Sequence, residues 1–208
     1  QSVVGVRHLC REPPASVGVL GAGFQARFQL RVLDELVDVG RFKLYDIADG
    51  RAGDLAADPG PELDADVTVT DTPQAAADAD AVVTVTDSKT PVLEESWLPP
   101  DGLVIALGSY RELPDETVLG ADRIVVDHTE QCLQRGALSD LAGRGEVTAS
   151  DLDTTIGEVV DSEDTHPAPP DERVLFVPIG LGSLDIALAE HLRTDGMGDG
   201  GVRRFEFR

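Results

Sequence analysis

The chain has 208 residues, which fits one large domain, or one domain and part of another. Hydrophobic residues make up 41% and aromatic residues only 4%, so the core must be built from Val, Leu, Ala and Ile. No apolar run reaches the roughly 18 residues of a membrane span, and no basic-then-apolar leader predicts secretion. Two cysteines, Cys10 and Cys132, are too few for a disulfide framework or a four-ligand zinc site.

Acidic residues dominate the charge balance. Asp and Glu total 39 against 17 Lys and Arg, for a formal net charge of −22. Nucleic acid and anionic membranes are excluded as partners, because binding either needs a basic surface. Among the cations, only Lys43 and Lys89 are lysines. An Asp-rich, Lys-poor folded chain is typical of a cytoplasmic protein from a salt-loving organism, where molar salt shortens the Debye length to about 3 Å.

The first half of the chain alternates helix and strand. Residues 2–10 predict a helix that ends before Pro13, and the apolar residues 17–20 predict a short buried strand. A Gly-Ala-Gly turn leads into a predicted helix over 24–39. Apolar side chains recur there at helical spacing and predict its buried face: Phe28, Val32, Leu36 and Val39. Residues 42–46 predict a second strand, whereas 48–65, rich in Gly, Asp and Pro, has no clear pattern.

The second half continues the alternation. A third strand at 67–69 leads to Pro73, which suits the first position of a short Ala-rich helix. Further strands are predicted at 81–86, 103–107, 123–126 and 174–177, and helices at 129–135, 150–160 and 184–192. An acidic, Pro-rich loop is expected at 161–171, and a segment rich in Gly and Asp ends the last helix at 195–201.

Short apolar strands that alternate with helices predict a parallel sheet covered on both faces. Because the strands are apolar along their whole length, they must be buried on both sides. The expected fold is therefore α/β, a doubly wound, mostly parallel sheet of the Rossmann dinucleotide-binding type, which occupies residues 15–180.

The strongest chemical signal is the turn between the first predicted strand and the helix, Gly21-Ala22-Gly23-Phe24-Gln25-Ala26, which matches G-x-G-x-x-A. Gly21 allows the tight turn, Gly23 lets the backbone approach a pyrophosphate, and Ala26 permits close helix–strand packing. The free N–H groups and the dipole of the helix then bind the anion. Phe24 and Gln25 belong to the same predicted cofactor-binding turn.

Asp46 ends the second predicted strand, close to the spacing of about 20 residues at which an acid binds ribose hydroxyls. An acid there favours NAD over NADP, because it repels a 2′-phosphate. Ile47 is predicted to contact the cofactor beside it, and Arg51 nearby is a weak argument for NADP. Two alternatives stay open: another ligand such as FAD or S-adenosylmethionine, and a turn that binds nothing.

In this architecture ligands bind outside the carboxyl ends of the strands, so the loops that follow the strands form the predicted site. Three such loops carry small or hydroxyl residues expected to approach the ribose and nicotinamide: Thr84, Val85, Thr86 and Ser88, then Gly108 and Ser109, then Gly180, Leu181 and Gly182. No pair of His residues has metal-ligand spacing, and no Ser lies in a nucleophile pattern, so no metal site is predicted.

These residues resemble the ornithine cyclodeaminase/mu-crystallin family. The resemblance covers residues 2 to about 192 and includes VLGAGFQAR at 19–27, where Gln-Ala-Arg after the second glycine is more specific than the generic fingerprint. The other matching motifs are VTVTDS at 83–88, PVL at 91–93, WL at 97–98, ALGS at 106–109, EL at 112–113, AD at 121–122, VVD at 125–127, GEV at 157–159 and GLGSLD at 180–185.

The resemblance implies a two-lobed, homodimeric, NAD(P)-dependent protein that transfers hydride between the nicotinamide and the α-carbon of an amino acid or its imine. Family members include ornithine cyclodeaminase, archaeal alanine dehydrogenase and ketimine reductases such as mu-crystallin. Their chains are longer, and their opening segment forms most of a second lobe that dimerises and holds the substrate carboxylate. The resemblance thus implies that residues 1–14 are the remnant of a linking helix from that missing lobe, with 181–208 as a C-terminal helix and tail.

One departure from the family pattern bears on the reaction. Cyclodeaminases and archaeal alanine dehydrogenases of the family place an Asp two residues after the glycine that ends the fifth strand, where it takes part in proton transfer. Tyr110 stands at that position here, and the loop to Glu112 is shortened. Tyr is a poor base near neutral pH, which disfavours ornithine cyclisation. Tyr110 and Arg111 are the candidate catalytic residues, with Arg111 as a group that could hold a carboxylate.

The leading hypothesis is an NAD-dependent oxidoreductase acting on a small amino acid or cyclic imine, of the alanine dehydrogenase, ketimine reductase or cyclodeaminase type. In such enzymes the cofactor carries the hydride, while the protein supplies orientation and a dry cleft. This chain would be the cofactor-binding part, inactive alone and homodimeric when full length. The alternative is a catalytically inactive NAD(P)-binding module.

Overall fold

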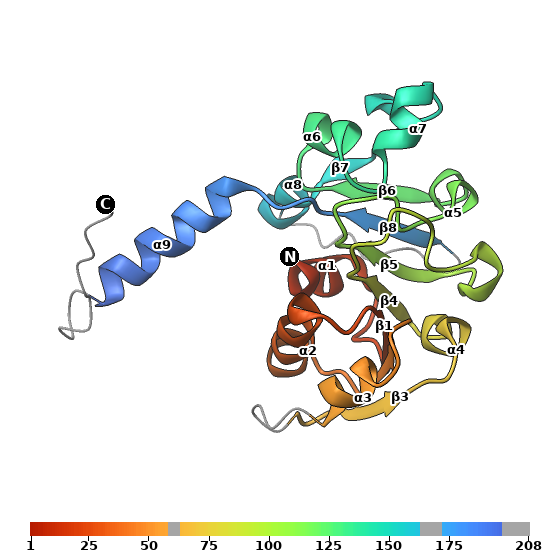
Figure 1. Cartoon of the computed structure of the whole chain (residues 1–208). Coiled ribbons are helices and arrows are strands. Elements are labelled where there is room, and N and C mark those ends of the chain that lie inside the picture. The colour runs from red at the N-terminus through yellow and green to blue at the C-terminus, as the bar shows by residue number, and fades with distance from the viewer. Residues whose placement is uncertain (58–62, 163–171, 197–208) are drawn as a thin grey trace, which may run out of the picture.

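Eight strands form one sheet, in the order β3-β2-β1-β4-β5-β8-β6-β7 (Figure 1). The computed structural model describes residues 1–57, 63–162 and 172–196. The strands are β1 (Ser16–Leu20), β2 (Arg41–Tyr45), β3 (Asp66–Val69), β4 (Ala81–Thr84), β5 (Gly102–Ala106), β6 (Arg123–Val126), β7 (Thr154–Thr155) and β8 (Arg173–Val177). All neighbouring strands pair in parallel, which confirms the predicted doubly wound α/β sheet.

Helices cover both faces of this sheet. One face carries α1 (Ser2–Leu9), α2 (Phe24–Leu36), α3 (Arg51–Ala56) and α8 (Ile156–Asp161). The other carries α4 (Pro73–Ala77), α5 (Asp115–Leu119), α6 (Thr129–Gln134) and α7 (Ser139–Arg144). The 3-10 turns are η1 (Glu95–Trp97) and η2 (Ala149–Asp151). β4 and β8 are buried at every position, as expected for strands covered on both sides. The expectation was wrong for β3, which is exposed at three of its four positions because it is the edge strand of the sheet.

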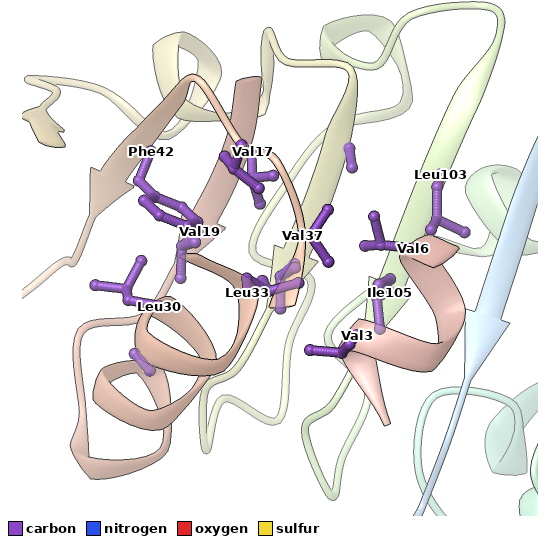
Figure 2. Close-up of a cluster of buried hydrophobic side chains, with 14 of the residues drawn as sticks. Val3, Val6, Val17, Val19, Leu30, Leu33, Val37, Phe42, Leu103 and Ile105 are labelled. Carbon is purple, nitrogen blue, oxygen red and sulfur yellow. The ribbon is translucent and has the colours of Figure 1, made fainter. Parts of the chain in front are cut away.

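The core on the first face forms where α1 and α2 lie side by side on the sheet (Figure 2). Figure 2 labels side chains of both helices, of the strands beneath them and of the turn after α2: Val3, Val6, Leu30, Leu33, Val17, Val19, Phe42, Leu103, Ile105 and Val37. Each fully buried side chain of this size contributes about 1.5–3 kcal/mol of transfer free energy. This packing holds α2 and β1 in a fixed relation, and the turn between them is the main candidate site.

The strand order reverses between β1 and β4. From β1 the chain runs outward to β2 and β3, then returns through α4 to β4 on the other side of β1. Gly18 permits close packing of α4 there, because a Cβ on Gly18 would overlap the carbonyl oxygen of Ala76. The carboxyl ends of β1 and β4 thus meet at the reversal, which is the usual ligand position in such sheets.

The predicted buried face of the second helix was wrong. α2 ends at Leu36 rather than at residue 39, and Phe28, Val32 and Leu36 are 42%, 36% and 46% exposed, whereas Val39 is buried but lies beyond the end of the helix. The buried side chains are instead Ala26, Leu30 and Leu33. Both sets have helical spacing. The set with Ala26 faces the sheet because the helix begins directly after β1, where only a small side chain fits.

The predicted helix over 150–160 was also wrong in part. The chain forms η2, the short strand β7, and only then α8. Asp153 interrupts the helix, because its carboxylate accepts the N–H of Ile124 at 2.7 Å. Thr155 then caps α8 by accepting the N–H of Glu158, and Glu158 returns a bond to the Thr155 N–H. This Thr-x-x-Glu capping box marks the true helix start.

Other differences are smaller. α3 lies within the unassigned segment 48–65, and α5, α7 and β7 have no counterpart among the predicted elements. α9 (Gly182–Gly196) is longer than predicted, extends away from the sheet (Figure 1), and exposes its described side chains. Residues 163–171 of the predicted acidic loop and 197–201 of the predicted terminal segment lie outside the described residues. Within the described part of the chain, no helix combines the length and the apolar character that a membrane crossing needs.

Candidate cofactor site at the carboxyl edge of the sheet

β1 ends in a turn that only glycine fits. Gly21 has a φ of +105°, a conformation that other residues rarely adopt. A Cβ on Gly21 would lie 2.6 Å from the carbonyl oxygen of Val85. The Gly21 N–H donates to the carbonyl oxygen of Tyr45 at 2.9 Å. The turn therefore lies between the ends of β2 and β4 with no room for a side chain.

The N-terminus of α2 is open. Gly23 is its N-cap residue, and no side chain caps the first N–H groups of this helix. A Cβ on Gly23 would meet nothing within 4 Å, so the fold itself does not demand glycine there. A glycine keeps clear the space in front of a helix N-terminus, where free N–H groups and the dipole favour an anion. The space that a Cβ would fill is the space that a pyrophosphate needs.

A hollow of about 550 Å³ opens beside this turn, which is within the range of ligand pockets. Its lining comes from the turn, α2 and α3: Ala22, Gly23, Phe24, Arg27, Arg51, Asp54 and Leu55. The fold thus brings Arg51 to the glycine turn. Ile47, nearby in sequence, is 90% exposed and therefore open to a ligand.

Asp46 follows β2 and contacts the same turn. One carboxylate oxygen accepts the N–H of Ala22 at 2.7 Å, and the other accepts the N–H of Ala48 at 2.8 Å. A carboxylate has about four lone-pair positions, so acceptor positions remain for ribose hydroxyls. The acid predicted to bind the ribose therefore also shapes the turn that would bind the pyrophosphate.

A buried carboxylate that the sequence analysis did not assign to the site joins the next two loops. Glu112 is fully buried in the segment between β5 and α5. One oxygen accepts the N–H and the hydroxyl of Thr86, each at 2.6 Å. The other accepts the Thr84 hydroxyl at 2.9 Å and the Gly108 N–H at 2.6 Å. Burial raises the pKa of Glu112, while hydrogen bonds from Thr86, Thr84 and Gly108 oppose that rise.

The third loop is held by Asp127, which follows β6. One Asp127 oxygen accepts the N–H groups of Ile179 and Gly180 at 3.1 and 2.8 Å, and also the side-chain amide of Gln1 at 2.9 Å. The other oxygen accepts the thiol of Cys132 at 3.3 Å. Both Glu112 and Asp127 lie in motifs of the family resemblance, but nothing in their spacing marked them as supports for neighbouring loops.

The remaining predicted residues differ in how far they reach the surface. Thr84 and Gly108 are buried beneath the edge, while Thr86 and Val85 are half-buried and Ser109 is exposed. Ser88 forms a local turn in which its hydroxyl donates to the Thr90 carbonyl at 2.7 Å. Leu181 is half-buried and Gly182 begins α9. Among the described residues, no group of His, Cys, Asp and Glu has the arrangement of a metal site.

The model of the ornithine cyclodeaminase/mu-crystallin family matches residues 1–198. The chain belongs to this family. It is 29% identical over 194 residues to alanine dehydrogenase from Archaeoglobus fulgidus, a match that covers 90% of this chain and 58% of the relative. It is 27% identical to Δ1-pyrroline-2-carboxylate reductase from Bacillus cereus, with 99% of this chain and 65% of the relative covered. The chain therefore spans about three fifths of the length of these family members.

Solved structures of the family share the fold. An archaeal alanine dehydrogenase dimer with bound NAD superposes with a TM-score of 0.87 at 27% identity, covering 99% of this chain and 65% of that one. The complex of Thermococcus litoralis Δ1-pyrroline-2-carboxylate reductase with NADH and L-proline gives a TM-score of 0.89 at 23% identity, covering 98% and 65%. The second likeness supports the fold alone.

The two candidate catalytic residues lie at the same edge of this family fold but in different surroundings. Tyr110 is 46% exposed, and the Lys89 ammonium lies 5.3 Å from the centre of its ring. Arg111 donates to Asp115 at 2.8 Å, and Arg144 contacts the other Asp115 oxygen at 2.6 Å. Although partial burial alone raises the pKa of Asp115, these two guanidinium groups hold it below its usual value. Arg111 is thus already paired with a carboxylate of the chain.

Proposed function

We propose that this chain is the cofactor-binding part of an NAD-dependent oxidoreductase. The reaction is hydride transfer between the nicotinamide and the α-carbon of a small amino acid or cyclic imine. The observation that carries this proposal is the glycine turn at the reversal of strand order, with the open N-terminus of α2 beside it and Asp46 beneath it. The activities in the names of the relatives, alanine dehydrogenase and Δ1-pyrroline-2-carboxylate reductase, support it.

The residues present fit a dinucleotide. The N–H groups at the start of α2 would hold the pyrophosphate, and the free lone pairs of Asp46 would accept ribose hydroxyls. The loops at Thr86, Ser109 and 180–182 would flank the nicotinamide. When bound, the nicotinamide supplies the hydride chemistry. The residues of this chain bind the cofactor, orient it and keep water from its reactive face.

NAD is the proposed cofactor rather than NADP. The Asp46 carboxylate stands where a 2′-phosphate would bring a second negative charge, whereas Arg51, which lines the hollow, is an argument for NADP. Fluorescence titration of the chain with NADH and NADPH in molar KCl tests this. We expect tighter binding of NADH. A folded chain that binds neither cofactor contradicts the proposed function.

For the substrate, we propose an amino acid dehydrogenase or imine reductase rather than an ornithine cyclodeaminase. Tyr110 replaces the Asp that the family resemblance implies for proton transfer, and a phenol is a poor base near neutral pH. The same replacement favours a second candidate, a module that binds NAD(P) without catalysis. Amino acid-dependent reduction of NAD by the full-length protein separates the two: turnover supports the enzyme, and cofactor binding without turnover supports the module.

We also propose that the full-length protein is a homodimer and that it works in a cytoplasm of high salt, as in a halophilic archaeon. The net charge of −22 and the scarcity of lysine support this setting. If it is right, the unfolding midpoint of the chain rises steeply between 0.1 M and molar KCl as the repulsion between carboxylates is screened. An unfolding midpoint that does not change with KCl contradicts the proposed setting.

A further inference from the structure

The full burial of the Glu112 carboxylate needs an explanation, because a charge far from water is unfavourable unless its oxygens are all bonded. Here both oxygens are saturated. Each accepts one backbone N–H and one hydroxyl: Thr86 provides both donors to the first oxygen, while Gly108 and Thr84 provide those to the second. Four donors around two oxygens leave no acceptor position of the buried carboxylate unpaired.

Gly108 is part of the same construction. A Cβ on this residue would overlap the Glu112 carboxylate group. Gly108 therefore lacks a side chain because the carboxylate occupies that space, and not because of an unusual backbone angle. Since Glu112 follows Gly108 by only a few residues, the segment after β5 folds back on itself to place the carboxylate beneath its own start.

Glu112 lies just beyond the last backbone hydrogen bonds between β4 and β5. β4 and β5 pair as far as Thr84 and Ala106, and the Leu107 N–H still donates to the Thr84 carbonyl at 2.8 Å. Beyond that bond the strands have become loops. The N–H groups of Thr86 and Gly108, one from each loop, both point to Glu112 instead. The carboxylate thus continues the connection between the two strands into the candidate site.

Thr86 carries this connection on to the glycine turn. A Cβ on Gly21 would lie 2.9 Å from the Thr86 methyl group, so Thr86 sits directly against the turn. On its other side, its hydroxyl and N–H are fixed by Glu112. A displacement of Thr86 would therefore move the loop after β4, which would flank the nicotinamide. It would also change the packing against the glycine turn, which would bind the pyrophosphate.

We propose that Glu112 is a positioning residue for the dinucleotide: by fixing Thr86 and Gly108, it sets the spacing between the two loops that receive the nicotinamide half of the cofactor. This inference rests on the proposed function, because the loops matter only if a dinucleotide lies over them. Glu112 itself lies below the surface, so it acts on the cofactor only through Thr86 and Gly108.

The test uses the variant Glu112→Gln in molar KCl. Glutamine has the same shape, but one of its terminal atoms is an NH₂ donor. The two backbone N–H groups approach different oxygens, so neither orientation of the amide can accept both. We expect the Kd for NADH to rise about tenfold or more in a chain that still folds. We also expect faster hydrogen exchange at the Thr86 and Gly108 amides in the variant without cofactor.

Asp122 offers a matched control. Its carboxylate accepts the Arg173 N–H at 2.8 Å at the start of β8, on the opposite edge of the sheet. Asp122→Ala removes a similar carboxylate–amide bond and should lower the unfolding midpoint without changing the Kd for NADH. If the Kd for NADH depended only on the stability of the fold, both variants would raise it. Only a positioning role moves the Kd with Glu112→Gln and leaves it unchanged with Asp122→Ala.

If Glu112→Gln does not fold, the variant Thr84→Val tests the positioning role instead. This variant removes one hydroxyl donor to the carboxylate and keeps nearly the same volume, so a rise of about threefold in the Kd for NADH is expected. If Glu112→Gln folds and its Kd for NADH is unchanged, the positioning role is overturned. The same holds for an unchanged Kd in Thr84→Val if Glu112→Gln does not fold. In both cases the proposed function stands. If the wild-type chain binds no NADH, the proposed function fails and the positioning role fails with it.

Discussion

The carboxylate of Asp46 accepts the backbone N–H of Ala22 at 2.7 Å, which ties the end of β2 to the turn after β1. The same side chain holds Ala48 with its other oxygen. The acid expected to recognise a ribose is therefore also a structural support of the neighbouring turn. A substitution at Asp46 should affect both cofactor recognition and stability.

We predict that Asp46→Ala weakens NADH binding by at least about tenfold and narrows the preference for NADH over NADPH. The ribose loses its acceptors, while the repulsion of a 2′-phosphate disappears. Loss of the two backbone bonds should also lower the free energy of unfolding by about 1–3 kcal/mol. Parallel titrations with both cofactors and a denaturant melt measure these effects. An unaltered ratio of the two Kd values would show that Asp46 does not set cofactor preference.

Alanine substitutions at the two glycines of the turn should have different effects, one on stability and the other on NADH binding. Gly21→Ala introduces a Cβ against the Val85 carbonyl at a φ of +105°, so we expect a loss of about 2 kcal/mol or more of stability. Gly23→Ala meets no atom of the chain within 4 Å, so its stability should stay within about 1 kcal/mol of the wild type. Its Cβ would nevertheless enter the pyrophosphate space, and NADH binding should be lost.

Gly143 in α7 provides the control for this pair. A Cβ there also meets nothing within 4 Å, and alanine is the better helix former. Gly143→Ala should therefore raise stability slightly and leave the Kd for NADH unchanged. Unimpaired NADH binding by Gly23→Ala would argue that no pyrophosphate lies at the start of α2.

The raised pKa of Glu112 predicts an unusual pH response. In the unfolded chain this carboxyl ionises near its ordinary value of 4.5, whereas in the folded chain burial keeps it protonated to a higher pH. Between these two values the folded state binds more protons, so lowering the pH through the folded pKa toward 4.5 adds stability from this group. Wild-type stability relative to Glu112→Gln should therefore increase as the pH falls through that window. Denaturant melts of both proteins measure it, and a difference that shrinks instead would contradict the raised pKa.

Both thiols should be unreactive in the folded chain. Burial, aided by the nearby Asp80 carboxylate, raises the pKa of Cys10 to about 12. Burial likewise raises the pKa of Cys132 to about 11. Because the thiolate is the nucleophile, iodoacetamide at pH 8 should label each at least about a hundredfold more slowly than in the unfolded chain. Mass spectrometry of timed samples gives the rates, and rapid labelling of Cys10 under native conditions would refute this.

The sequence was sufficient for seven of the eight strands in the described sheet and for the glycine turn, because both depend on local patterns, but it missed the two-residue strand β7. Short apolar runs bounded by turn residues favour strands, and each position of G-x-G-x-x-A has a defined structural role. It was insufficient for the face of α2, where two apolar stripes compete. Only the close approach to β1 selects the stripe with Ala26 over the stripe with Phe28.

The role of Glu112 could not be predicted for a different reason. Its four hydrogen-bond donors come from the loops after β4 and β5, and the sequence does not show that these loops meet over one carboxylate. By contrast, the start of α8 was readable: Thr155 and Glu158 have capping-box spacing, and a search for caps rather than for apolar periodicity would have found it.

Asp127 binds the side-chain amide of Gln1 and the N–H groups of Ile179 and Gly180 with a single oxygen. The segment that enters the sheet domain and the segment that leaves it toward α9 are therefore neighbours in space. Domains with adjacent ends tolerate circular permutation. In a chain that stops before α9, a short linker from Gly180 to Gln1, with new termini at the exposed turn of Gly145 and Glu146, would preserve every strand pairing of the sheet.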